Sequence, residues 1–102
     1  MKERFDAAAV ALRKGDWQQA RHLALDLIPE MPSNAALHFI AGAAALELRQ
    51  LPSAIECLSR AADLDPNRAD YLAQLSRALV AARANKEALA VAEKAWVLSP
   101  QV

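Results

Sequence analysis

A 34-residue spacing between prolines constrains the fold of this chain more than any other feature of its sequence. Three prolines and three alanines repeat with that spacing, namely Pro32, Pro66 and Pro100, and Ala20, Ala54 and Ala88. Proline makes up only about 5% of average sequences, so two further prolines at set positions would coincide by chance about once in 400 trials. A fixed period of 20–50 residues is typical of stacked structural repeats. The 102 residues therefore predict three repeat units rather than two separate domains.

The composition favours helices and argues against several classes of function. Hydrophobic residues, many of them alanine and leucine, make up 55% of the chain, and only two residues are glycine, which disfavours a turn-rich β fold. Twelve basic and twelve acidic residues give zero net charge, so we expect no nucleic-acid surface and no membrane anchor. Acidic residues near the N-terminus argue against a signal peptide. The apolar stretches are too short to predict a membrane span. We expect a soluble, cytoplasmic protein.

Breaks in the apolar pattern predict six helices joined by short loops. Gly15 ends the first, prolines end the second, and Asp16, Asn34, Asn67 and Asn85 are candidate N-caps. The expected helices span residues 2–14, 17–28, 35–49, the stretch from a first turn at Pro52 to about 63, 69–82, and 86 to about 98. Six such helices form a run of antiparallel helical hairpins.

The period and the residues at set positions resemble the tetratricopeptide repeat, a 34-residue helix–turn–helix unit. In units 1–34, 35–68 and 69–102 the family pattern places small residues at the eighth and twentieth positions and proline at the thirty-second. The eighth position is Ala8, Gly42 and Ser76, and the twentieth is Ala20, Ala54 and Ala88. The resemblance implies one all-α domain, a right-handed superhelical solenoid of three hairpins spanning residues 1–102.

Two departures from the family pattern bear on packing. The first unit has Arg4, Ala7 and Ala11 where the family has large residues, so its first helix is expected to be displaced or partly exposed. Arg49 and Arg83 stand where glycine often ends the first helix of a unit.

The resemblance also implies a concave groove that binds a peptide or a partner chain. The matching positions are Lys2, Phe5, Ala9, Leu12, Arg13, Ala36, Phe39, Ala43, Leu46, Glu47, Asp70, Ala73, Arg77, Val80 and Ala81. This set is mostly apolar, which favours an amphipathic helix or a hydrophobic extended peptide. Phe5 and Phe39 can alternatively be core residues. The family's carboxylate clamp is not expected, because its positions are Phe5, Ala9, Ile40, Asp70 and Gln74, which offer no cation.

Candidate catalytic and metal-binding residues are few. His22 and His38 lie on different predicted helices and match no zinc motif, and Cys57 has no base nearby in the sequence. Asp63, Asp65 and Asp70 do not have EF-hand spacing, and helix ends explain them better. We therefore expect a non-enzymatic protein without a metal or another cofactor.

The last predicted helix carries Leu89, Trp96 and Leu98, some of which we expect to be exposed because no further helix follows. Either the chain is a fragment of a longer protein, which we favour, or a partner or a second copy covers this end. The leading hypothesis is a scaffold that binds a segment of another protein. The alternatives are an accessory domain of a larger enzyme such as a sulfotransferase or glycosyltransferase, and a self-association module acting through Leu89, Trp96 and Leu98.

Overall fold

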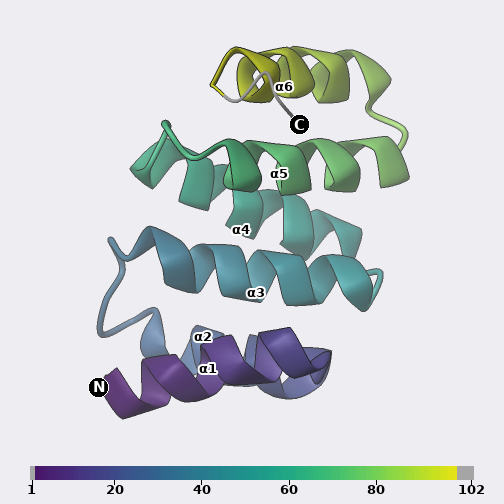
Figure 1. Ribbon diagram of the computed structural model, residues 1–102. Coiled ribbons are helices and arrows are strands. Elements are labelled where there is room, and N and C mark those ends of the chain that lie inside the picture. The colour runs from purple at the N-terminus through teal and green to yellow at the C-terminus, as the bar shows by residue number, and fades with distance from the viewer. Residues whose placement is uncertain (1, 99–102) are drawn as a thin grey trace.

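The computed structural model describes residues 2–98, which form six helices and no strand. The helices are α1 (Lys2–Lys14), α2 (Trp17–Leu27), α3 (Ala35–Glu47), α4 (Leu51–Leu64), α5 (Ala69–Ala81) and α6 (Asn85–Leu98). They pair into three hairpins that stack in chain order (Figure 1). The predicted all-α solenoid is therefore confirmed, and the helix ends agree with the predicted ranges to within two residues.

The helices form two layers, and neighbouring helices approach each other more closely in one layer than in the other. The backbones of α1 and α3 are in contact, as are those of α3 and α5, whereas no such contact joins α2 to α4 or α4 to α6 in the described chain. Because the helices of the α1–α3–α5 layer lie closer together, the stack curves with that layer on its inner side.

No helix of the described residues is long and apolar enough to cross a membrane.

Each hairpin interface is filled by residues from one hairpin and from the first helix of the next. Buried residues of α1, α2 and α3 form one cluster, which includes Leu27 and Leu37. Residues of α3, α4 and α5, together with Ala88 of α6, form the other, which includes Leu46 and Leu58. The first helix of a hairpin is therefore what covers the hairpin before it.

His38 is a structural residue in this core. Its side chain is buried, and its Nε2–H donates a hydrogen bond of 2.9 Å to the carbonyl oxygen of Pro32. This bond ties α3 to the loop that precedes it and satisfies the polar ring in the interior. The sequence interpretation of His38 as a packing residue agrees with this contact.

The first helix of every hairpin ends in the same left-handed turn. Gly15, Arg49 and Arg83 have φ angles of 80°, 63° and 65°. At each of them the next residue donates its amide to the carbonyl five positions earlier, at 2.8–2.9 Å. This is the hydrogen bond of a Schellman motif, in which glycine is the usual left-handed residue. The two arginines thus adopt a conformation that costs an L-residue about 1–2 kcal/mol.

Replacing either arginine by glycine is expected to stabilise the protein. Arg49→Gly and Arg83→Gly should each raise the free energy of unfolding by about 1 kcal/mol, because the left-handed conformation carries no Cβ penalty in glycine. The same substitution at the exposed helical residue Arg60 is the control and should lower it by about 1 kcal/mol. Urea denaturation measures all three, and a destabilised Arg83→Gly protein would contradict the strained-cap interpretation.

Two of the four residues predicted to be N-caps have that role in the structure, and two do not. Asp16 accepts a hydrogen bond from the amide of Gln19 at 3.4 Å, and Asn34 accepts one from the amide of Leu37 at 3.2 Å. The predictions for Asn67 and Asn85 were wrong. Arg68 is the N-cap of α5 and makes no side-chain capping bond, and Asn85 is already inside α6. Arg68 instead binds Asp70 and lies over the ring of Tyr71, 4.5 Å from its centroid.

Candidate functional site

Several residues predicted to line an apolar groove are packed between hairpins instead. Phe5 and Leu12 are half-buried against the first cluster, and Leu46, only 4% exposed, belongs to the second. Phe39 is half-buried and stacks on Tyr71 with 4.7 Å between ring centroids. Leu46 is therefore a core residue, and the packing of Phe5 and Phe39 agrees with the alternative that they belong to the core. Binding of a partner at the half-buried positions stays a prediction. Two more predicted groove residues, Ala9 and Ala43, are half-buried and buried.

What remains exposed on the α1–α3–α5 layer is mostly polar. Arg13, Glu47 and Arg77 are exposed, and Arg77 lies 3.5 Å from the carboxylate of Glu47. Ala36 and Ala81 are half-buried, and the side chain of Lys2 lies outside the described part of the chain. Apart from Val80 of α5, the inner layer therefore exposes mainly charged and small side chains.

The exposed apolar positions of α5 are the ones whose counterparts are buried in the earlier hairpins. Val80 is 55% exposed, whereas Leu46, 34 residues earlier, is 4% exposed. Ala73 is exposed, whereas its counterpart Phe39 is half-buried under α5. The difference arises because α3 covers the first hairpin and α5 covers the second, while no helix of the described residues covers the third.

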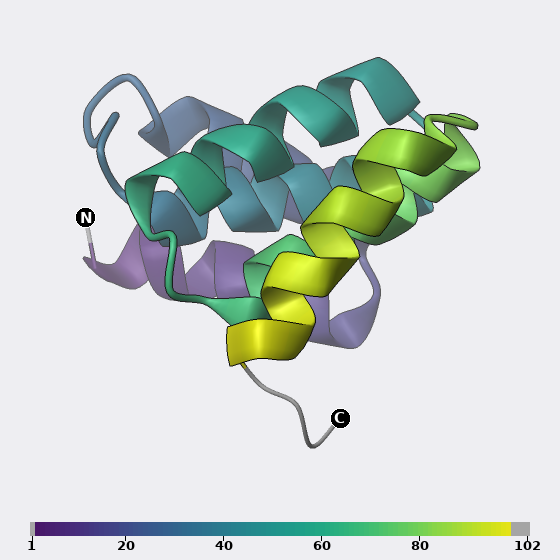
Figure 2. The ribbon, with the colours of Figure 1, turned by 90° about the horizontal axis from the view of Figure 1, so that it is seen from above.

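The same comparison holds for α6. Leu89, Ala92 and Trp96 occupy the positions that Ile55, Leu58 and Ala62 occupy in α4. Ile55 is half-buried and Ala62 is 9% exposed, whereas their counterparts Leu89 and Trp96 are 61% and 58% exposed. Figure 2 looks down on this end of the stack, where α6 lies uncovered. We call this surface the end face, made by Ala73 and Val80 of α5 and by Leu89, Ala92 and Trp96 of α6.

A cavity of about 580 Å³ opens on the end face between α5 and α6. Its lining residues are small except for one carboxylate and one indole, and they are Ala69, Asp70, Ala73, Ser76, Ala92, Ala95 and Trp96. The hydroxyl of Ser76 donates to the carbonyl oxygen of Ala88 at 3.1 Å, which holds the two helices together beneath the cavity. The cavity thus joins two predicted groove residues, Asp70 and Ala73, to the predicted self-association residue Trp96.

Asp70 is the charged group at the rim of this cavity. Arg68 donates two hydrogen bonds to its carboxylate, of 3.0 and 2.8 Å. These bonds lower the pKa of Asp70, so the carboxylate stays ionised at neutral pH. The cavity therefore combines an apolar wall with a fixed negative charge at one edge.

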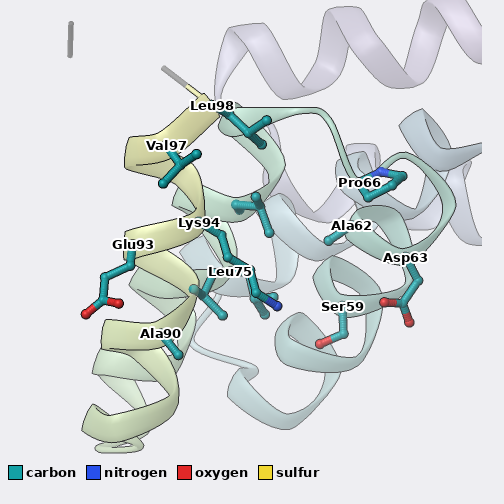
Figure 3. A pocket seen from close by; sticks show the side chains of 12 residues that line it. Ser59, Ala62, Asp63, Pro66, Leu75, Ala90, Glu93, Lys94, Val97 and Leu98 are labelled. Carbon is teal, nitrogen blue, oxygen red and sulfur yellow. The ribbon is translucent and has the colours of Figure 1, made fainter. Parts of the chain in front are cut away.

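A second cleft of about 820 Å³ lies between α4 and α6 on the other side of α6. Figure 3 shows Lys94, Val97 and Leu98 of α6 on one side of it, and Ser59 and Asp63 of α4 on the other. The three residues predicted to act in self-association therefore lie on two different surfaces of α6. Leu89 and Trp96 belong to the end face, whereas Leu98 lines this cleft.

The residues considered for catalysis or metal binding do not come together. His22 is exposed and lies 3.4 Å from Asp26, and His38 is engaged with Pro32. Burial raises the pKa of the half-buried Cys57 thiol, with a smaller contribution from the neighbouring Glu56 carboxylate, so the thiol is poorly suited to act as a nucleophile. Among residues 2–98, no group of three or more His, Cys, Asp or Glu side chains could hold a metal ion.

Comparisons with known proteins agree with this architecture. No protein-family model matches the chain, and no curated protein matches it in sequence. Among solved structures, it superposes with a TM-score of 0.89 and 24% identity on the TPR2B domain of yeast Sti1, solved in complex with pHsp70, over 99% of this chain and 81% of that one. The MamA RS-1 ArsTM double mutant gives 0.89 and 25% over 95% of this chain.

A third similar structure is an enzyme, the Thermobaculum terrenum O-GlcNAc transferase, with a TM-score of 0.90 and 26% identity over 98% of this chain. This chain spans 55% of the length of the MamA structure and 19% of the transferase. The 34-residue period, the three stacked hairpins and these superpositions lead to one conclusion: the chain has the fold of tetratricopeptide-repeat domains.

Proposed function

We propose that this chain is a non-enzymatic protein-interaction module that holds a segment of a partner protein against its end face and the adjoining inner layer. The observation that carries the proposal is the exposure of Val80, Leu89 and Trp96 on the end face, where Trp96 also lines the cavity between α5 and α6. Exposed apolar surface with a polar rim is typical of protein-binding sites. Asp70 and Arg77 supply charges beside it that would orient a partner.

The similarity to the Sti1 domain, whose structure contains pHsp70, supports this class of function without specifying the partner. Because the exposed surface of the inner layer is mostly polar, the proposed binding site is smaller than the groove predicted from the sequence. A partner that relied on apolar contacts would find them on α5 and α6, where Ala73 and Val80 belong both to the end face and to the predicted groove.

A second candidate is that this module is the accessory domain of a larger enzyme. The observation that favours it is the similarity to the O-GlcNAc transferase, in which a region of this size is only part of the chain. The intact mass of the native protein from its source cells decides this point. A mass near 11.0 kDa would support a free-standing module, and a much larger mass would support the accessory domain.

Site-specific photo-crosslinking in the source cells tests the proposed function. A benzoylphenylalanine at Val80 should crosslink one partner protein through a single segment, because Val80 lies on the proposed site. The control is the same residue at Glu56, which is exposed on α4 and outside the end face. Equal crosslinking from both positions, or none from Val80, would contradict the proposal.

A further inference from the structure

We propose that the cleft between α4 and α6 is a second binding site, which takes aliphatic side chains and one carboxylate from a segment of another protein. We call it the outer cleft, because it opens on the layer formed by α2, α4 and α6 (Figure 3). It lies on the other side of α6 from the cavity of the end face. The inference therefore goes beyond the proposed function and concerns a different surface.

The outer cleft is open because α4 and α6 carry small side chains along it. Three of its lining residues are smaller than their counterparts 34 positions earlier, namely Ser59 for Leu25, Ala62 for Ile28, and Ala90 for Glu56. In the first hairpin, Ile28 packs against the buried cluster of α1, α2 and α3. Leu75 of α5 is larger than its counterpart Ala41, but it offsets only one of the three exchanges. The open space therefore follows from the residues of α4 and α6 themselves.

The openness of the outer cleft does not depend on how far the chain continues. Two helices follow α4, and in the described chain the backbone of neither α5 nor α6 contacts that of α2. The hairpin that follows α4 thus leaves the space between α2 and α4 uncovered. A further hairpin stacked in the same way on α5 and α6 would leave the outer cleft uncovered too. Leu64 agrees with this, because it is 38% exposed although two helices follow it, and its counterpart Leu98 is 41% exposed.

The lining of the outer cleft favours aliphatic side chains in the occupant. Its floor is apolar, with Leu72 and Leu75 of α5 each 7% exposed and Val91 of α6 half-buried. At the equivalent positions of the first hairpin, Leu25 and Ile28 supply the bulk that α4 lacks. Aliphatic side chains from a partner would take their place, and the apolar surface that they bury would stabilise the complex.

One charged side chain crosses the outer cleft. Figure 3 shows Lys94 extending from α6 toward Ser59 of α4, whereas Glu93 points away from the cleft. Lys94 forms no ion pair with any residue that the structure describes. A carboxylate placed among the aliphatic side chains of the partner would meet this amine beside an apolar floor, where the attraction is stronger than in open water.

A second copy of this chain fits the outer cleft less well. On the outer layer, Leu25 and Leu64 are each the one exposed aliphatic residue of their helix within the described chain, so neither helix offers a pair of such side chains. Val97 and Leu98 do form an exposed pair. Inserting them into the cleft of another copy would bring Lys94 of one copy toward Lys94 of the other, which is unfavourable.

Filling the outer cleft from within tests the open space without a partner. Ser59→Leu and Ala62→Ile each introduce the residue that stands at the counterpart position of α2. Each variant should unfold at the same or a higher urea concentration than the unmodified protein, because the new side chain enters open space. Arg60→Leu is the matched control, since it adds a leucine to an exposed position of α4 outside the cleft. A lower midpoint in both cleft variants than in this control would overturn the proposal.

Photo-crosslinking from the rim of the cleft tests the occupant. Val97 lines the cleft and is 77% exposed, so a benzoylphenylalanine there leaves the floor open. In the source cells it should crosslink one segment of another protein, in which mass spectrometry finds at least two aliphatic residues and an Asp or Glu. Ser59→Leu should reduce this product at least about tenfold, and Arg60→Leu should not. Lys94→Met should reduce it about twofold to fivefold through loss of the ion pair.

Other outcomes of the crosslinking overturn the proposal. An equal yield in Ser59→Leu would place the partner outside the cleft, and a crosslinked segment without an acidic residue would contradict the role of Lys94. A crosslink to a second copy, or to another part of the same chain, would assign the cleft to that occupant. If Val80 gives a product and Val97 gives none, this inference fails and the proposed function stands. If Val97 gives the product described above and Val80 gives none, the proposed function fails and this inference stands.

Discussion

Leu46→Ala is expected to lower the free energy of unfolding by about 2–5 kcal/mol, whereas Val80→Ala is expected to change it by less than about 0.5 kcal/mol. The two residues occupy the same position in consecutive hairpins, yet Leu46 is 4% exposed and Val80 is 55% exposed. Leu46 belongs to the cluster that joins the second hairpin to α5, so its truncation leaves a cavity. Val80 loses few contacts, and alanine has the higher helix propensity.

Urea denaturation of the two variants at low protein concentration measures this difference. Leu12→Ala, at the third equivalent position, is half-buried and should give an intermediate value. A loss in Val80→Ala as large as in Leu46→Ala would mean that Val80 is buried in solution. Since no helix of the described chain covers it, that result would require association between copies, and the loss should then depend on protein concentration.

The sequence predicted the fold because its signals are local or periodic. The recurrence of Pro32 as Pro66 and the helix-ending Gly15 do not depend on tertiary context, and they located the six helices correctly. The end of α5 is a partial exception. Arg83 lacks the intrinsic preference of glycine for positive φ, and only the repeat frame indicates that the chain turns there as it does at Gly15.

The candidate site was less predictable from the sequence, because the exposure of a residue depends on whether the following hairpin covers it. Phe39 and Ala73 share a position in the repeat, and a groove prediction based on that position treats them alike. In the structure α5 covers Phe39, and nothing in the described chain covers Ala73. The cavity beside Ala73 also depends on Trp96, 23 residues further along the chain, and no local pattern in the sequence relates these two residues.

Gly42→Ala is the second substitution with a large expected effect. A Cβ at Gly42 would lie 2.7 Å from Cγ of Leu58 and 3.0 Å from the backbone nitrogen of Leu58, so α3 and α4 would have to separate. We expect the free energy of unfolding to fall by about 1–3 kcal/mol, even though alanine is the better helix former by about 1 kcal/mol. Urea denaturation measures the loss, and an unchanged or raised stability would contradict the close approach.

The repeat itself supplies the second-site control for this prediction. The eighth and twenty-fourth positions hold Gly42 with Leu58 in the second hairpin, but Ala8 with Ala24 in the first. A Cβ at the eighth position is therefore compatible with this fold when the facing residue is alanine. Leu58→Ala alone should cost about 2–5 kcal/mol by leaving a cavity, and adding Gly42→Ala to it should cost much less than Gly42→Ala alone. Additive losses would place the clash on the backbone of α4 rather than on the side chain of Leu58.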